Sequence, residues 1–269
     1  MGVLHVASVD DPRLADYRNV PDPDLLRSRG VFIAEGRHVV RRLVTGSRYT
    51  ARSLLLTPAA VESLTDLLPV LDAVPVFVVS QAAMNAVTGF NIHRGCLAIG
   101  ERRPLPSWQS LASGARLLVL LEQVANADNV GGIFRNAAAF GVEAVLLGPS
   151  CTDPLYRKAI RTSMGATLQI PFALMEDWPA DLHRLKDQGF RVLALTPSDA
   201  AHALDALGAA PRTALLVGHE GNGLSDEALG AADVTARIPM AAAVDSLNVA
   251  TATAIALYAL RRGLTPSSA

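Results

Sequence analysis

Apolar residues in the second half of the chain form short continuous runs of strand length. The runs are ARLLVLLEQV, VEAVLLG, FRVLALT and TALLVG. Helical periodicity alternates with them, near residues 130–140, 155–163, 179–188 and 225–231. Continuous hydrophobicity indicates strands that are covered on both faces. The pattern predicts an α/β fold with a mostly parallel sheet between helices, in which ligands bind at the carboxyl ends of the strands.

The first half has the pattern of a smaller α/β unit. VFIAEG is typical of a strand that ends in a turn, and RHVVRRLVTG of a helix that buries its valines and its leucine. Further strands are expected at ARSLLLT, VPVFVVS and GCLAIG, and a helix at PAAVESLTDLLPVLDA. ERRPLPSWQSLASG, residues 101–114, has the composition of a connector. We therefore expect two domains, residues 1–106 and residues 107–269.

Positive charge gathers in one segment of the first half. Between residues 27 and 52 there are seven arginines and a single acid, Glu35, although the formal net charge of the whole chain is -1. On the predicted helix the arginines fall on the outer face, where they can meet a polyanion such as RNA. A solvated helix face is the alternative. The residues expected to contact RNA are Arg27, Arg29, Arg37, Arg41 and Arg42.

The chain has no pattern of a membrane span, a secretion signal or a metal site. Its apolar stretches stop short of the ~18 to 20 residues of a membrane helix, and no basic start precedes an apolar core at the N-terminus. Cys96 and Cys151 stand apart from each other and from any histidine at metal-ligand spacing. We expect a cytoplasmic protein with structural thiols and no metal.

The first strand-end loop of the second half is ANADNVGGIFRNAAAFG. Asn126, Asp128 or Asn129 can cap the helix that begins there, and two glycines permit close backbone approach. Arg135 lies about one and a half turns beyond Asn129. A helix N-terminus with a nearby arginine suits a phosphate or a carboxylate. Taken alone, this loop is explained better by a capped helix with a solvated arginine.

The second loop, HEGNGLSDEALG, is rich in glycine. Glu220 lies inside the turn, and Ser225 is placed to cap the next helix. The glycines at 218, 221 and 223 fit neither the Walker pattern nor GxGxxG, which argues against nucleoside triphosphates and dinucleotides. Their backbone groups can instead surround an uncharged ring such as adenine. A tight turn from strand to helix explains the loop equally well.

The third loop, ARIPMAAAVDSLNVATATA, consists largely of small residues. Asp245 or Ser246 is expected to cap the helix that follows, which leaves Asn248 in its first turn. Alanine and threonine along this helix allow another backbone to approach it closely. Three such loops in one domain, each after a strand, are uncommon.

In order and spacing, NVGGIFRNAAAFG, LLVGHEGNGLSDE and RIPMAAAVDSLNVATATAIAL closely resemble the three signature motifs of the SpoU branch of the SPOUT superfamily, the ribose 2′-O-methyltransferases of tRNA and rRNA. The resemblance covers most of residues 115–262. VFIAEGRHVVRRLV resembles, more loosely, the ribosomal-protein-like RNA-binding domain often fused to these enzymes. Family members usually have glycine between IPM and SLN, where this chain has AAAVD. The resemblance implies a C-terminal trefoil knot and a homodimer.

The resemblance also implies a reaction and a site. S-adenosylmethionine would donate a methyl group to the ribose 2′-hydroxyl of a specific nucleotide in structured RNA, with rRNA favoured over tRNA. Arg135 would lie at this hydroxyl. Because a guanidinium stays protonated, we expect it to bind the adjacent phosphate and to stabilise the developing alkoxide. The implied catalytic residues are Arg135, Asn129, Glu220, Ser246 and Asn248. The implied cofactor-binding residues are Gly218, Ile238, Leu247, Thr196 and Met240.

Two other functions compete with this one. A non-catalytic RNA-binding protein with a degenerate methyltransferase domain would have no need to retain all five catalytic residues. A Rossmann dehydrogenase would need the glycine fingerprint that this chain lacks. Loops of 23S rRNA or tRNA and an antibiotic-resistance site are all compatible targets. Deletion of residues 1–106 is expected to leave a foldable domain that binds the cofactor but methylates RNA poorly.

Overall fold

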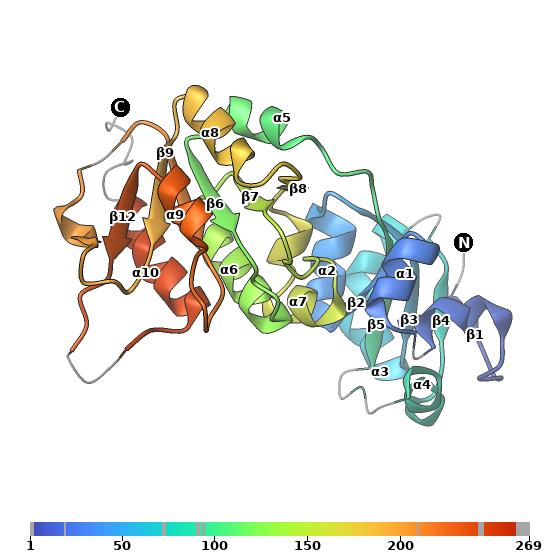
Figure 1. The fold of residues 1–269 in the computed structure, drawn as a ribbon. Helices are drawn as coiled ribbons and strands as arrows, with labels where there is room; N and C mark the ends of the chain where they lie inside the picture. The colour runs from blue at the N-terminus through green and yellow to red at the C-terminus, as the bar shows by residue number, and fades with distance from the viewer. Residues whose placement is uncertain are drawn as a thin grey trace, which may run out of the picture. The chain divides into compact units, whose positions relative to one another are not determined.

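The computed structural model describes residues 3–18, 20–71, 74–89, 92, 95–208, 210–241 and 245–261 (Figure 1). The chain forms two units, each with its own sheet. Unit 1 consists of residues 1–104 and 154–169, and unit 2 of residues 105–153 and 170–269.

Unit 1 is built on a five-stranded mixed sheet. Its strands, in spatial order, are β1 (Val3–His5), β4 (Val76–Val78), β3 (Thr50–Leu56), β5 (Cys96–Glu101) and β2 (Val31–Glu35). β4 runs parallel to β1 and β3, whereas β5 runs antiparallel to β3 and β2. The helices of this unit are α1 (Asp22–Ser28), α2 (Arg37–Gly46), α3 (Pro58–Ser63), α4 (Gln81–Thr88), α7 (Arg157–Thr162) and the 3₁₀ helices η1 (Pro12–Tyr17), η2 (Thr65–Leu71) and η3 (Ala166–Leu168).

Helix α2 follows the predicted apolar spacing. Val39, Val40 and Leu43 are buried and Val44 is half-buried, so the polar residues between them face outward. The predicted helix over residues 58–73 is divided instead into α3 and η2, with Pro69 inside η2. A proline removes a backbone donor and disfavours a continuous α-helix.

Residues 154–169 belong to unit 1, although the sequence analysis placed them with the C-terminal domain. Helix α7 packs against β2. The backbone N–H of Arg157 donates to the Asp22 carboxylate at 2.9 Å, and its Nε donates to Glu35 at 2.8 Å. These contacts join segments more than 120 residues apart, which no local pattern reveals.

Unit 2 is built on a seven-stranded sheet whose neighbouring strands all run parallel. Their spatial order is β10 (His202–Ala203), β12 (Val234–Arg237), β9 (Arg191–Leu195), β11 (Thr213–Val217), β6 (Leu117–Leu121), β7 (Ala144–Leu147) and β8 (Phe172–Leu174). The predicted mostly parallel sheet is confirmed. A short 3₁₀ helix, η4 (Leu204–Ala206), follows β10.

Helices cover both faces of this sheet (Figure 1). Helices α5 (Trp108–Ser113), α8 (Ala180–Asp187) and α9 (Asp226–Ala231) share one core with alternate residues of the strands, such as Leu118 and Leu120. Helices α6 (Ala127–Phe140) and α10 (Val249–Arg261) pack against each other, and α10 also contacts β11. Because successive strand residues point to opposite faces, both sets of side chains must be apolar. This explains the continuous hydrophobic runs.

The expected connector 101–114 contains a helix that the sequence analysis did not predict. Ser107 caps α5 by accepting a hydrogen bond from the Ser110 N–H at 3.2 Å, and Trp108 and Ala112 are buried in the core. A helix of six residues is too short to show sustained periodicity. Strand β1, helices η1, α1 and α4, and the edge strands β8 and β10 were also missed. No helix within the described ranges is long and apolar enough to cross a membrane.

Candidate active site

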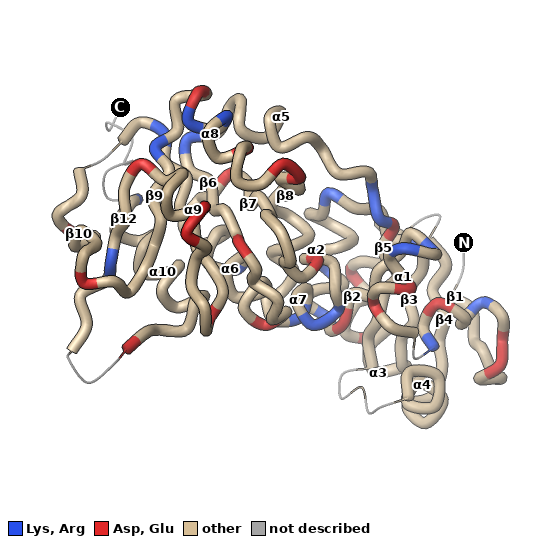
Figure 2. The backbone as a smooth tube through the Cα atoms, viewed as in Figure 1, with Lys and Arg blue, Asp and Glu red and all other residues tan. Residues whose placement is uncertain are grey.

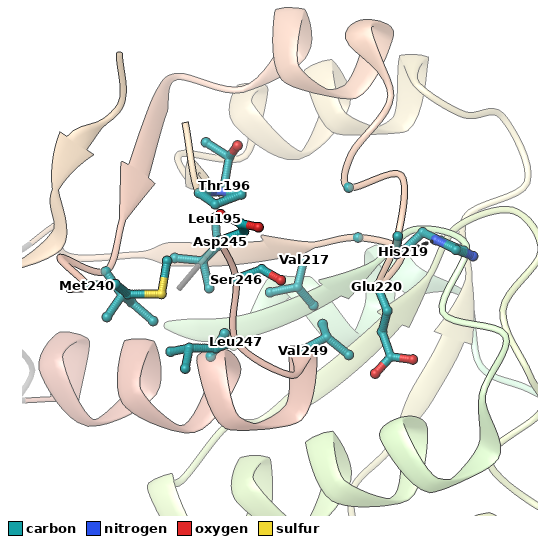
Figure 3. A pocket seen from close by; sticks show the side chains of 16 residues that line it. Leu195, Thr196, Val217, His219, Glu220, Met240, Asp245, Ser246, Leu247 and Val249 are labelled. Carbon is teal, nitrogen blue, oxygen red and sulfur yellow. Dashed lines mark hydrogen bonds between the residues drawn. The ribbon is translucent and has the colours of Figure 1, made fainter. Parts of the chain in front are cut away.

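A cavity of about 290 Å³ lies in unit 2 at the carboxyl ends of β9 and β11 (Figure 3). Its walls come from residues 195–197 at the end of β9, the end of β11 and the loop after it, the segment between β12 and α10, and the start of α10. The five residues implied as cofactor contacts all line it: Thr196, Gly218, Ile238, Met240 and Leu247. Glu220 and Ser246 line it as well.

The loop after β11 makes a tight turn that only glycine permits at its first position. A Cβ at Gly218 would lie 2.6 Å from the Gly223 carbonyl oxygen, which is too close for any side chain. His219 and Gly223 exchange two backbone hydrogen bonds of 3.0 Å across the turn. Gly223 has a φ of 71°, which favours glycine. The loop therefore returns sharply and leaves Glu220 exposed at its tip.

Glu122, which the sequence analysis did not select, anchors the far end of this loop. Its side chain is 1% exposed and follows β6. Ser225 donates to it through its backbone N–H at 2.8 Å and through Oγ at 2.7 Å, and Trp178 donates through Nε1 at 2.8 Å. Ser225 also caps α9 as predicted, because its Oγ accepts from the Ala228 N–H. The sequence feature that could have identified Glu122 is an acidic residue directly after an apolar strand.

Asn248 joins the three strand-end loops. Its Nδ2 donates to the Asn129 Oδ1 at 2.9 Å and to the Glu220 Oε1 at 2.8 Å. Its Oδ1 accepts from the backbone N–H groups of Ala250 and Thr251 at 3.0 and 3.2 Å. All four hydrogen bonds that an asparagine side chain can make are therefore formed.

This arrangement corrects the predicted cap of α10. The helix begins at Val249, and Asn248 occupies the capping position instead of the first turn. Neither Asp245 nor Ser246 accepts a hydrogen bond from the start of the helix among the described residues. An asparagine cap uses only the amide oxygen, so the NH₂ group is left to hold Asn129 and Glu220. Residues 242–244 of the AAAVD segment lie outside the described residues.

Close packing of α6 and α10 brings Asn129 to Asn248. Asn126 caps α6 by accepting from the Asp128 N–H at 2.8 Å. A Cβ at Gly132 would lie 2.8 Å from the Cβ of Ala250, and Asn136 Nδ2 donates to the Ala250 carbonyl at 2.8 Å. The small residues of α10 thus permit the close backbone approach that the sequence indicated.

Arg135 is not brought to this group within the chain. Its side chain is exposed on α6 and is not among the cavity residues. It has no hydrogen-bond or ion-pair partner within the part of the chain that the structure describes. It lies six positions after Asn129, so the two side chains leave the helix about 120° apart. Ser246 lies at the cavity with an exposed side chain.

Figure 2 colours the basic and acidic positions along the backbone. By their hydrogen-bond and ion-pair partners, the five arginines of the expected RNA surface fall into two groups. Arg29 pairs with Asp16 at 2.8 Å, Arg41 forms a two-pronged pair with Asp66, and Arg42 donates to the Met164 carbonyl at 3.1 Å. Arg27 and Arg37 are exposed and have no such partner among the described residues. The predicted outer face therefore carries fewer unpaired charges than its sequence suggested.

The two thiols are poorly suited to nucleophilic chemistry. Burial raises the pKa of Cys96 to about 12 and that of Cys151 to about 11. Because the thiolate is the reactive form, both groups stay protonated and inert near neutral pH. Within the described ranges, no group of His, Cys, Asp or Glu side chains could hold a metal ion.

Fold and cavity together define an α/β protein with a cavity at the carboxyl edge of a parallel sheet, where proteins of this architecture bind ligands. Residues 116–258 match the model of the SpoU rRNA Methylase family. The chain belongs to this family, and its class is therefore that of the RNA methyltransferases.

Individual relatives agree with this assignment over nearly the whole chain. An uncharacterized tRNA/rRNA methyltransferase of Mycobacterium bovis is 45% identical over 96% of this chain and 91% of its own length. The 23S rRNA (guanosine(2553)-2′-O)-methyltransferase of Bacillus subtilis is 25% identical over 95% of this chain and 98% of its own. The AdoMet-bound rRNA methyltransferase from Sinorhizobium meliloti superposes with a TM-score of 0.81 at 26% identity, covering 98% and 99% of the two chains.

Proposed function

We propose that this protein transfers a methyl group from S-adenosylmethionine to the ribose 2′-hydroxyl of a specific nucleotide in structured RNA, with rRNA favoured over tRNA. The observation that carries the proposal is the junction of three loops, where Asn248 holds Asn129 and Glu220 at the cavity formed by Gly218 and Leu247. The 2′-O-methyltransferase activity of the Bacillus subtilis relative supports the choice of acceptor.

The cavity fits the proposed cofactor in size and in chemistry. About 290 Å³ is near the lower end of the volumes of small-molecule sites, and the cavity is open to solvent at exposed residues such as Ser246. Gly218 has no side chain to cover its backbone at the cavity. A Cβ at this position would collide with Gly223. Ile238, Met240 and Leu247 supply apolar walls suited to a flat ring. When bound, S-adenosylmethionine supplies a methyl group on a sulfonium centre.

The chain's own contribution is to hold the acceptor in place. Glu220 has one carboxylate oxygen fixed by Asn248, so its direction at the rim is set before RNA arrives. Asn248 has no hydrogen-bonding capacity left for substrate, so we assign it to positioning. Correct placement of reacting atoms can contribute about 7 to 11 kcal/mol to catalysis. Ser246, which is exposed beside the cavity, is free to bind the RNA.

Arg135 completes the proposed site by binding the phosphate next to the target ribose. A guanidinium matches a phosphate with two parallel hydrogen bonds, and Arg135 is exposed without a competing partner among the described residues. Since it lies apart from Asn248 in the single chain, we propose that it enters the site of a second copy. Ile255 and Tyr258 of α10, which are 39% and 56% exposed, give that copy an apolar surface.

Four earlier expectations enter the proposal unchanged. The family resemblance implies a homodimer and a trefoil knot near the C-terminus, and the sequence pattern indicates action in the cytoplasm and catalysis without a metal. Arg27 and Arg37 are the best candidates for phosphate contacts in unit 1, since both are exposed and lack internal partners among the described residues. Such contacts make binding fall steeply as salt rises.

A direct test compares 2′-O-methylated nucleotides of rRNA and tRNA by mass spectrometry, in cells with and without the gene. One position should lose its methyl group, and the purified protein should restore it from labelled S-adenosylmethionine. Arg135→Ala should abolish the transfer and leave cofactor affinity nearly unchanged. RNA binding without any methyl transfer by the unaltered protein would instead favour a non-catalytic RNA-binding role.

The subunit contribution of Arg135 has its own test. Arg135→Ala and Asn248→Ala chains, carrying different tags, are co-expressed and the mixed dimers purified. Each homodimer should be inactive, whereas a mixed dimer regains one site with an intact Arg135 and an intact Asn248. Mixed dimers that are folded and inactive would show that the arginine serves the site of its own chain.

A further inference from the structure

His219 lines the cavity, and none of the roles above uses it. It follows Gly218 at the end of β11 and directly precedes Glu220 (Figure 3). Its ring Nδ1 lies 2.8 Å from the backbone nitrogen of Gly221 and 3.0 Å from that of Asn222. The ring therefore bridges the two residues that follow Glu220.

These contacts fix the chemical state of the ring. A backbone N–H group can only donate a hydrogen bond, so Nδ1 must accept from both amides. Nδ1 can accept only when it carries no proton, which places the hydrogen of the neutral ring on Nε2. In this loop His219 acts as a hydrogen-bond acceptor.

These two hydrogen bonds to the His219 ring matter because the backbone of the loop can adopt many conformations. We call this pair of contacts the His219 brace. Glycine occupies positions 218, 221 and 223, and glycine gives a turn little stiffness. One pair of backbone hydrogen bonds, between His219 and Gly223, closes the turn at its base. The His219 ring adds two more at its tip. Glu220 lies between these constraints, and its carboxylate must reach Asn248.

We propose that His219 is a positioning residue that orders the loop from Gly218 to Gly223, so that Glu220 is held against Asn248 for the transfer reaction. This inference rests on the proposed function. What the loop requires is an acceptor atom two bonds from Cβ. Asparagine supplies one, since its Oδ1 has the same bond separation as Nδ1 and readily accepts from backbone N–H groups two residues ahead. Leucine has a similar bulk and no acceptor.

Three variants of the full chain test the proposal through methyl-transfer kinetics. His219→Leu should lower kcat about tenfold or more, because the loop loses two hydrogen bonds. His219→Asn should keep kcat within about threefold of the unaltered protein. His183→Asn, at an exposed position on α8, is the matched control and should have no effect. Equal loss of kcat in the leucine and asparagine variants would overturn the role of the acceptor.

A second measurement needs no RNA and separates this inference from the proposed function. In protein with ¹⁵N-labelled histidine, the Nδ1 of His219 should show the chemical shift of an unprotonated nitrogen at neutral pH. The backbone amide hydrogens of Gly221 and Asn222 should exchange slowly with solvent in the unaltered protein and in His219→Asn, and rapidly in His219→Leu. A proton on Nδ1, or equal exchange in all three, would overturn the inference. Slow exchange in a protein that transfers no methyl group would refute the proposed function alone.

Discussion

At the scale of single residues, Asn248 shows how one side chain serves structure and chemistry together. Its oxygen caps α10 and its NH₂ group holds Asn129 and Glu220. The motif marked Asn248 as a site residue. Only the structure shows that its amide oxygen and its NH₂ group have different roles. This separation allows stability and activity to be tested independently.

Asn248→Asp should abolish most methyl transfer while leaving the fold intact. Aspartate caps a helix as well as asparagine does, so the free energy of unfolding should change by less than about 1 kcal/mol. Its carboxylate has no N–H to donate and repels Glu220, so the rate should fall about a hundredfold. Urea unfolding and a labelled-methyl assay measure the two effects. A normal rate in this variant would show that the Glu220 contact is dispensable.

At the scale of elements, the site depends on how loops and helices are tied to the sheet. Glu122 ties the loop after β11 to β6, and the contact between Gly132 and Ala250 sets the spacing of α6 and α10. Neither feature touches the cavity, so both should act through stability and loop position. The strand-end location of the site was predictable from the continuous apolar runs. The contacts that hold the loops join distant segments and left no periodic signal.

Glu122→Gln should destabilise the protein by about 1 to 3 kcal/mol, because the two carboxylate oxygens accept from the Ser225 N–H and from Trp178, and the NH₂ group of glutamine would face one of these donors. Glu176→Gln is a suitable control, since Glu176 is exposed on the same unit. Chemical denaturation of both variants gives the comparison. Equal stability of the two would mean that the Glu122 contacts contribute little.

Gly132→Ala and Gly230→Ala form a matched pair within helices. Both replacements favour helix by up to about 1 kcal/mol. The new methyl group at residue 132 would meet Ala250 at 2.8 Å, whereas at residue 230 it enters open space. Overpacking should make Gly132→Ala less stable than Gly230→Ala by about 1 to 3 kcal/mol. Thermal unfolding measures the difference, and equal midpoints would mean that α6 and α10 can move apart freely.

At the scale of the whole molecule, the chain does not divide at a single point. Residues 154–169 pack with β2 and α1 of unit 1, although the segments on both sides of them belong to the parallel sheet of unit 2. This finding changes the expectation for a truncated protein. Removal of residues 1–106 would expose Ala159 and Ile160, which are now fully buried, and would leave Arg157 without Glu35.

The truncated chain should therefore be less stable than it would be if unit 2 were one continuous domain with no segment packed in unit 1. We expect local disorder of residues 154–169, visible as fast amide exchange and proteolysis within that segment, while the parallel sheet persists. Circular dichroism and limited digestion of residues 107–269 make the test. Full protection of the segment from protease would show that it folds without unit 1.

The sequence by itself determined the parallel α/β class, the strand-end position of the site and seven of the residues that line the cavity, because hydrophobic continuity and motif spacing are local properties of the chain. The tertiary structure decided which groups meet: the cap and double contact of Asn248, the anchor at Glu122, the brace at His219, and the internal partners of Arg29, Arg41 and Arg42. The cap of Asn248 and the brace at His219 are local contacts within one loop or helix start, whereas the others join residues that lie far apart in sequence. Only packing fixes such distances.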